Sequence, residues 1–219
     1  LFPSTTLFRS PEPPTDGTYV SVVTTLLGVS FNSSLVRPED IPKTWEDVVS
    51  PRFAESMLLA DPRNVPVYAN LFAVLRERFG EDYLRKLAAQ RPKLVDSSVP
   101  GSQQLAAGEA ALLLPNIESV TAALEAKGAP VKTVILEPTV GSEFLAAISS
   151  NADHAEQARV FMDFLLSEKG QTVLAQSFRG SSKLGALPGS TPFPAGYVAP
   201  DVPAALKQLP ELVKLLGIG

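Results

Sequence analysis

Residues 57–78 read MLLADPRNVPVYANLFAVLRER, and this stretch decides the class of fold. It begins with an apolar run, Met57–Ala60, which is typical of a short buried strand. A polar turn follows, in which Pro62 disfavours the helical conformation for Asp61 and Asn64 is a favourable N-cap. Beyond the turn, apolar residues recur at the spacing of an amphipathic helix. The stretch therefore predicts a strand, a tight polar loop and a helix.

The same alternation continues along the chain and predicts an α/β domain. Three predicted strand ends carry polar or small residues, at 61–64, 97–102 and 115–116. If the strands are parallel, these loops gather at one edge of the sheet, where ligands bind and helix N-termini offer N–H groups. Apolar periodicity and turn residues give the remaining elements: strands over 93–96, 110–114 and 131–136, and helices over 81–90, 103–107 and 117–127.

Longer elements flank this domain on both sides. Residues 19–31, YVSVVTTLLGVSF, predict a strand long enough to cross between two lobes. Residues 144–149 predict a second such strand, followed by a helix over 155–166 that Asn151 or Asp153 caps. Three more helices are predicted: a short one that Thr44 and Asp47 open as a capping box, one over 171–176, and an amphipathic one over 206–216 that Pro210 interrupts.

Composition excludes several classes of protein. The 219 residues carry a net charge of −4 and no block rich in Lys or Arg, which argues against a nucleic-acid partner. No apolar run reaches the roughly 18 residues of a membrane span. There is no cysteine, so disulfides and thiolate sites are excluded.

Enzyme motifs are missing from the sequence. It contains no nucleophile elbow, no phosphate-binding P-loop and no dinucleotide fingerprint. The single histidine, His154, is interpreted as a solvated first-turn residue, and with no cysteine a His- or Cys-type metal site is excluded. A carboxylate metal site stays open, although no spacing of acidic residues indicates one. We therefore expect no catalytic residues, no metal site and no cofactor.

The first ten residues, LFPSTTLFRS, differ only at Ser4 from LFPYTTLFRS, a translated sequencing-adapter read-through. We expect residues 1–16 to be a non-native or disordered leader. A natural N-terminus with its signal peptide would then be lost.

Several segments between about residues 18 and 178 resemble, in order, the motifs of one family. That family is the bacterial extracytoplasmic solute-binding proteins of ABC importers, in the ferric-iron-like and related group with the type 2 periplasmic-binding fold. The segments include a crossing strand, a helix start, an Asp-Pro loop, a Gly-Glu turn, a Lys-Gly-Ala-Pro-Val return and a pair of helices. They are Gly28–Asn32, Pro42–Val48, Met57–Pro62, Ala106–Glu109, Ala126–Val131 with Glu137–Pro138, and Asn151–Ala175.

This resemblance implies a two-lobed protein of which the chain holds the second lobe, the hinge strands and only the returning part of the first lobe. The implied divisions are a crossing strand at 17–32, an α/β ligand-binding lobe at 33–137, a return strand and helices of the first lobe at 138–178, and a Gly/Pro-rich segment with a short helix at 179–219. The hinge would comprise the strands at 19–31 and 138–149.

The resemblance also implies a function. Such a protein captures a small solute between its lobes in the periplasm, or another extracytoplasmic space, and delivers it to a membrane permease that an ATPase powers. Alternatives are a ligand-sensing domain of a regulator with the same fold, or an α/β enzyme. Ferric-binding members use adjacent tyrosines as ligands, and this sequence has no Tyr-Tyr pair.

Candidate ligand-binding residues follow from the polar strand ends. A helix N-terminus beside the Arg63 guanidinium favours a carboxylate, phosphonate or phosphate group. Tyr68 lies within one helical turn of Asn64 and could face the same edge or pack against the sheet. The predicted set, in order of preference, is Arg63 and Asn64, then Ser98 and Ser102, then Asn116 and Tyr68.

Overall fold

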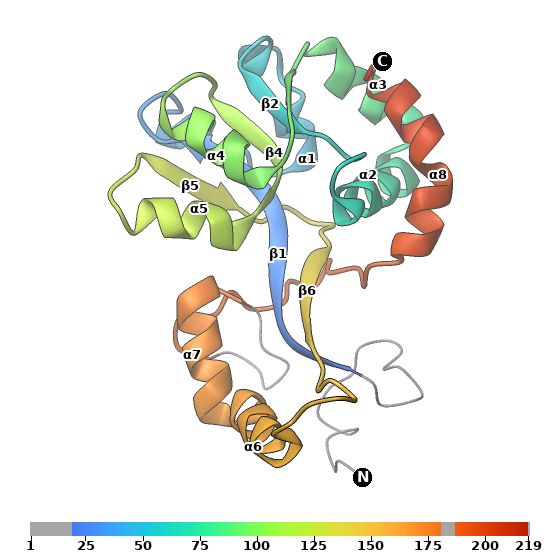
Figure 1. Ribbon diagram of the computed structural model, residues 1–219. Coiled ribbons are helices and arrows are strands. Elements are labelled where there is room, and N and C mark those ends of the chain that lie inside the picture. The colour runs from blue at the N-terminus through green and yellow to red at the C-terminus, as the bar shows by residue number, and fades with distance from the viewer. Residues whose placement is uncertain (1–18, 181–186, 219) are drawn as a thin grey trace. The chain divides into compact units, whose positions relative to one another are not determined.

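One strand of 13 residues, β1 (Val20–Asn32), belongs to both compact units of the chain (Figure 1). A computed structural model describes residues 19–180 and 187–218. Unit 1 comprises residues 1–25 and 142–193, and unit 2 comprises residues 26–141 and 194–219. After Val20 every residue of β1 is buried, which explains why its sequence is almost continuously apolar or β-branched. The long strand predicted over 19–31 is confirmed.

The sheet of unit 2 has the order β3-β2-β4-β1-β5. Its other strands are β2 (Met57–Ala60), β3 (Lys93–Val95), β4 (Leu112–Ile117) and β5 (Val131–Val134). Strand β2 pairs in parallel with both β3 and β4, whereas β1 runs antiparallel to β4 and β5. The parallel arrangement on which the predicted edge depended is therefore present, and the α/β class is confirmed.

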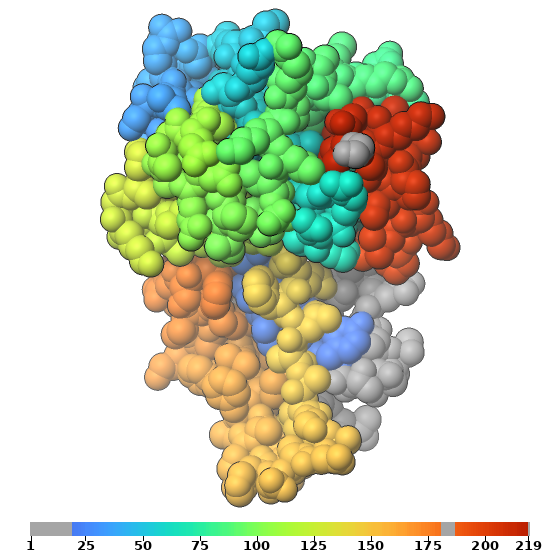
Figure 2. Space-filling model, turned by 45° about the horizontal axis from the view of Figure 1, so that its top comes forward, coloured from blue at the N-terminus to red at the C-terminus, as the bar shows by residue number. Residues whose placement is uncertain are grey.

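Helices pack on both faces of this sheet. In Figure 1, α4 (Ser98–Ala106) and α5 (Glu118–Glu125) lie together on one side, and α2 (Pro66–Phe79), α3 (Glu81–Ala89) and α8 lie together on the other. Helix α8 (Val202–Leu215), red in Figure 2, packs directly against α2, so the C-terminal segment returns to this unit. The short α1 (Trp45–Val48) has the predicted capping box of Thr44 and Asp47.

Aromatic side chains anchor the core of unit 2. The only tryptophan, Trp45, is fully buried, and its indole Nε1 donates to the Pro138 carbonyl at 2.9 Å. The buried Tyr83 hydroxyl donates to the Trp45 carbonyl at 2.9 Å. Each polar tip is thus paired, as burial requires. Trp45 is consequently a reporter of the folding of unit 2.

Several predicted boundaries are wrong. Helix α4 begins at Ser98 rather than after residue 102, because Pro100 is tolerated in a first helical turn. Strand β4 continues through Asn116 instead of ending at Leu114, because Asn116 pairs with Gly28 of β1. Pro210 lies inside a continuous α8 and does not interrupt it.

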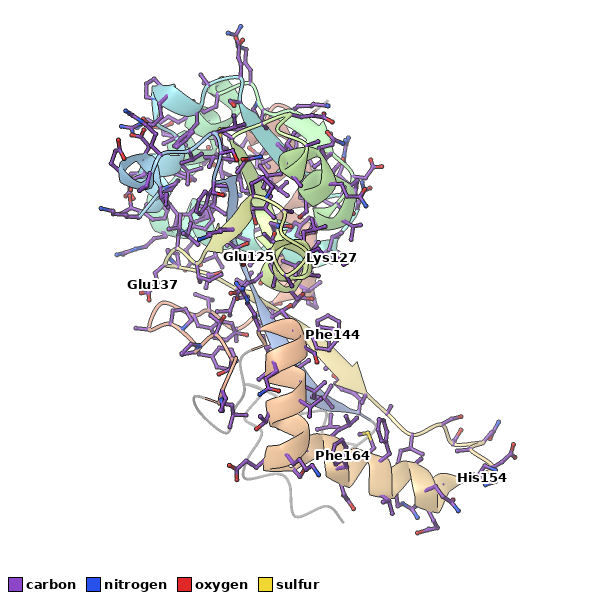
Figure 3. The ribbon with its side chains drawn as sticks, turned by 90° about the vertical axis from the view of Figure 1, so that its left-hand side faces the viewer. Glu125, Lys127, Glu137, Phe144, His154 and Phe164 are labelled. Carbon is purple, nitrogen blue, oxygen red and sulfur yellow. The ribbon has the colours of Figure 1, made fainter. Side chains whose placement is uncertain are left out.

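Unit 1 contains the N-terminal half of β1, β6 (Gly141–Ala146), α6 (Ala155–Leu166) and α7 (Glu168–Phe178). Strand β6 pairs with β1 and starts earlier than the predicted 144–149. His154 itself is the N-cap of α6, without a side-chain capping bond, so neither Asn151 nor Asp153 caps this helix. Figure 3 shows His154 at the end of α6 opposite Phe164.

Apolar side chains are widely exposed in unit 1. Val160 and Phe161 of α6 are 69% and 59% exposed, and Phe144 lies 5.9 Å from Phe178 between ring centroids. By contrast, the helices of unit 2 bury their apolar faces against the sheet or one another. Within the described residues, none of the helices has the length and apolar character needed to cross a membrane.

Candidate functional site

The three parallel strands of unit 2 end at one edge of the sheet, which we call the carboxyl edge: residues 61–65, 95–98 and 116–119. Helices α2, α4 and α5 begin there. Two bonds tie the first two segments together. The Asp61 amide donates to the Val95 carbonyl at 2.9 Å, and Asn64 Nδ2 donates to the Asp96 carbonyl at 3.1 Å.

The helices at this edge lack side-chain caps. Helices α2, α4 and α5 start after Val65, Ser97 and Ile117, and none of these N-caps bonds the first turn through its side chain. Among the other described helices, α1, α7 and α8 are capped by Thr44, Ser167 and Asp201, whereas α3 and α6 also lack a side-chain cap. The three first turns differ in what they leave available. Pro66 and Pro100 remove N–H groups from α2 and α4, the Ser98 amide donates to Tyr68 Oη, and the buried Glu118 belongs to the first turn of α5. The remaining N–H groups carry the partial positive charge of the helix ends, which favours an oxygen-rich ligand.

Arg63 is joined to Asp61 rather than directed freely at the edge. Its Nε donates to both carboxylate oxygens at 3.0 Å, its Nη2 donates to Oδ2 at 2.7 Å, and its backbone N–H donates to Oδ1 at 2.9 Å. Burial raises the pKa of the Asp61 carboxyl, but the bonds from Arg63 outweigh burial, and the net pKa lies below its usual value. The pair is close to neutral, so Arg63 contributes less positive charge than the sequence suggests.

The sequence predicted that Asn64 caps α2, and this prediction is wrong. The N-cap is Val65, and Pro66 occupies the first helical position, where its missing N–H costs nothing. The Asn64 side chain instead bonds the loop that follows β3. It is exposed at the carboxyl edge, where a solute can reach it.

Tyr68 and Ser98 meet beneath the edge. Their hydroxyl oxygens lie 2.5 Å apart, and the Ser98 amide also donates to Tyr68 Oη at 3.0 Å. The Ile117 amide donates to Ser98 Oγ at 3.1 Å. Burial raises the pKa of the Tyr68 hydroxyl, and the bonds with Ser98 offset part of this rise. Tyr68 thus combines both predicted possibilities: it is packed in the core and its hydroxyl is directed toward the helix starts.

Asn116 lies at the centre of a buried polar cluster. Its Nδ2 is 2.7 Å from Ser30 Oγ, 3.1 Å from Ser102 Oγ and 2.5 Å from Thr121 Oγ1. Ser30 Oγ also bonds Thr121 and Thr133, at 2.9 and 2.7 Å. Asn116, Ser102 and Ser30 are 0% exposed. This cluster joins α4 and α5 to the sheet.

The structure therefore brings the six predicted site residues to one region but in two layers. Arg63 and Asn64 form the exposed layer, while Tyr68, Ser98, Ser102 and Asn116 are buried behind it. Sequence reasoning missed two partners of Asn116, namely Ser30 and Thr121, and it also missed Thr133, which bonds Ser30. A polar residue inside an apolar strand, as at Ser30, is the signal that could have indicated one of them.

A metal centre is not evident in the part of the chain that the structure describes. Residues 19–180 and 187–218 contain no group of three or more His, Cys, Asp or Glu side chains placed to hold a metal ion. The carboxylate of Asp61 is occupied by Arg63.

The sequence also matches known proteins. The family model of bacterial extracellular solute-binding proteins matches residues 7–207. The chain belongs to this family. The resemblance found in the sequence motifs is thereby confirmed.

A curated relative of this solute-binding protein, an uncharacterized protein of Haemophilus influenzae, is 29% identical over 174 residues, which make up 75% of the chain and 49% of the relative. The chain thus spans about half the length of that relative.

Solved structures show the periplasmic-binding-protein fold. The substrate-binding protein of an ABC transporter from Agrobacterium tumefaciens superposes with a TM-score of 0.73 at 15% identity, over 91% of this chain and 67% of that one. AfuA from Actinobacillus pleuropneumoniae, with fructose-6-phosphate bound, gives 0.70 at 20% identity, over 100% and 74%. Iron-bound HitA from Pseudomonas aeruginosa gives 0.64 at 18% identity, over 99% and 74%.

Proposed function

We propose that this protein is the substrate-binding component of an ABC importer. It captures a small anionic or metal-complexed solute in the periplasm and delivers it to a membrane permease. The family match over residues 7–207 carries this proposal. Proteins of this kind bind and release their solute without chemical conversion, and we assign no catalytic residue.

The carboxyl edge of unit 2 is the part of the chain that we assign to the solute. In open α/β sheets, ligands bind beyond the carboxyl ends of the strands, and here three uncapped helices begin at that place. Val99, in the first turn of α4, is 54% exposed, so this turn is accessible from solution. Asn64 provides an exposed amide beside it.

The preference for an anion rests on the helices rather than on Arg63. Because Asp61 already binds the Arg63 guanidinium through both oxygens, that pair adds little net charge. The N–H groups of first helical turns favour oxyanions such as phosphate, phosphonate or carboxylate, including the carboxylates of a ferric complex. Two structural neighbours contain solutes of these kinds: AfuA has fructose-6-phosphate bound, which carries a phosphate, and HitA has iron bound.

Ligand-dependent stabilisation tests the proposal. Unfolding of the chain is followed by Trp45 fluorescence with inorganic phosphate, methylphosphonate, ferric citrate or spermidine, each against chloride at equal ionic strength. A ligand at 100 times its Kd stabilises the folded state by about 2.7 kcal/mol. We expect at least one oxyanion or the ferric complex to raise the unfolding temperature. Stabilisation by spermidine alone, or by no compound of the panel, would contradict the proposal.

A matched pair of variants localises the effect. Val99→Asp places a carboxylate in the first turn of α4, where it favours the helix but repels an anion. Val160→Asp makes the same change on the exposed surface of α6 in unit 1. We expect Val99→Asp to abolish the anion-dependent shift and Val160→Asp to retain it. Equal shifts in both variants would place the anion elsewhere.

A further inference from the structure

Two buried hydroxyl groups connect the three helix starts of the carboxyl edge. Tyr68 belongs to the first turn of α2, Ser98 is the first residue of α4, and Ile117 immediately precedes α5. The Ile117 amide donates to Ser98 Oγ, Ser98 Oγ pairs with Tyr68 Oη, and the Ser98 amide donates to Tyr68 Oη. These bonds form one continuous connection from α5 through α4 to α2.

The hydroxyl groups in this connection are buried, so water cannot easily take over their hydrogen bonds if they are removed. Tyr68 is 1% exposed and Ser98 is 2% exposed. A buried amide that loses its acceptor suffers the desolvation penalty without compensation, so the bonds hold the segments at a fixed spacing. The Asn116 cluster lies next to this connection and fixes α4 and α5 to the sheet, and the partners of its amide nitrogen lie in β1, α4 and α5. Tyr68 is therefore the side chain of α2 that bonds the start of α4, in addition to the Asp61–Val95 and Asn64–Asp96 bonds between the loops that precede these helices.

We propose that Tyr68 and Ser98 are positioning residues that set the relative placement of the N-termini of α2, α4 and α5 for binding a solute oxyanion. This inference rests on the proposed function of the carboxyl edge. It assigns the two residues an indirect role: they orient the N–H groups that face the solute, and their own hydroxyls stay beneath the surface. Binding should then depend on them more than their contribution to stability explains.

Matched variants are available for both residues. Tyr68→Phe removes a buried hydroxyl at the edge, and Tyr83→Phe removes a buried hydroxyl that bonds the Trp45 carbonyl in the same unit. Ser98→Ala removes the acceptor of an amide at the carboxyl end of β4. Ser56→Ala removes a hydroxyl that accepts from the Ala111 amide at 3.1 Å, just before the other end of β4, although this amide keeps the Ser56 carbonyl as an acceptor at 2.8 Å. Each control makes the same chemical change in unit 2 away from the helix starts.

The experiment combines amide hydrogen exchange with a titration of inorganic phosphate, both followed by NMR on the whole chain. Without phosphate, we expect Ser98→Ala to speed exchange of the Ile117 amide, and Tyr68→Phe to speed exchange of the Ser98 amide, by more than the change in global stability accounts for. With phosphate, we expect both variants to weaken the apparent Kd by about tenfold, the effect of losing one such bond. Tyr83→Phe and Ser56→Ala should leave the Kd unchanged.

The outcomes separate this inference from the proposed function. If phosphate shifts the amides of the three helix starts equally well in all variants, the edge binds the anion but the positioning role is wrong. If exchange responds as expected while phosphate shifts no amide at the edge in the unaltered chain, the proposed binding site is wrong, and the positioning role for a solute falls with it. If all four variants weaken binding in proportion to their loss of stability, the hydroxyls are structural only and the inference is overturned.

Discussion

The carboxyl edge contains two polar regions that differ in what they can bind. The inner region is the Asn116 cluster with its serine and threonine partners, buried and bonded to one another. The outer region is the turn at residues 61–64, where Arg63 and Asn64 are exposed. Both contain residue types typical of ligand sites, yet the inner polar groups already have partners within the protein. The inner region therefore holds the helices in place, and we propose that the outer region is the one that meets the solute.

Replacing Asn116 should give the largest effect on stability. Asn116→Leu leaves the buried hydroxyls of Ser30, Ser102 and Thr121 without the amide that they share. The leucine side chain is also larger than the asparagine side chain and has no polar atom to offer these hydroxyls. We expect a loss of about 3 kcal/mol in the free energy of unfolding. Urea denaturation followed by Trp45 fluorescence measures this loss, since the only tryptophan is buried in unit 2.

The matched control for this variant is Asn64→Leu, the same substitution in the outer region. If the two substitutions destabilise unit 2 equally, the division of the edge into two regions is wrong. A loss below about 1 kcal/mol for Asn116→Leu would likewise show that the inner cluster contributes no more than exposed polar groups do.

Gly101→Ala tests the placement of α4 against the sheet with a smaller perturbation. A Cβ atom at position 101 would lie 2.8 Å from Leu113 Cδ1 and 3.0 Å from Val95 Cγ2, so the helix or these side chains must shift. Overpacking of this kind costs about 1–3 kcal/mol. We expect a loss within that range by urea denaturation. An unchanged midpoint would mean that α4 has room to move, and the edge would then be less rigid than the Asn116 cluster suggests.

Much of this arrangement could be predicted from the sequence. The stretch at 57–78 predicted the strand, the turn and the helix correctly, because apolar runs and their breaks depend on local chemistry. The motif order predicted the family. The gathering of three strand ends at one edge followed from the expectation of parallel strands, which holds for β2, β3 and β4.

The direction of the side chains could not be predicted in the same way. Asn116 was expected in a loop, but β4 continues through it because β1 offers a pairing partner, and this pairing depends on a residue 88 positions earlier, Gly28 (116 − 28). Ser30 reaches Asn116, and Thr133 reaches Ser30, only after three distant segments form the sheet. Similarly, the bonds of Arg63 with Asp61 depend on the local turn geometry, which a residue pattern does not specify.

The Asp61–Arg63 pair in the outer region predicts a dependence of stability on pH. Because the folded-state pKa of Asp61 lies below its usual value, the ionised carboxylate stabilises the folded state above that usual value, and this contribution is lost as the pH falls through the folded-state pKa. In Arg63→Gln the charged bonds that lower the pKa of Asp61 are lost while the effect of burial remains, so the pKa of Asp61 should rise. We expect the variant to be less stable than the unaltered chain at pH 7, with the difference shrinking toward pH 3.

Thermal unfolding between about pH 3 and pH 7 measures this difference, across the range in which carboxylates titrate. The matched control is Arg85→Gln, which disturbs ion pairs with the exposed Asp82 and with Glu81 on α3 instead of the buried Asp61. A difference for Arg63→Gln that stays constant with pH would show that the arginine acts by packing alone.

The smallest effect on stability is expected from Asn64→Leu, and it separates binding from folding most clearly. The Asn64 side chain is exposed and makes one bond, to the Asp96 carbonyl, which water can replace when the amide is removed. We expect the free energy of unfolding to change by no more than about 0.5 kcal/mol, as for most surface substitutions. If the outer region meets the solute, however, anion-dependent stabilisation should fall in this variant, because an exposed donor beside three helix starts is lost. Equal stability together with unchanged anion binding would exclude Asn64 from the site and leave the backbone N–H groups of the helices as its principal donors.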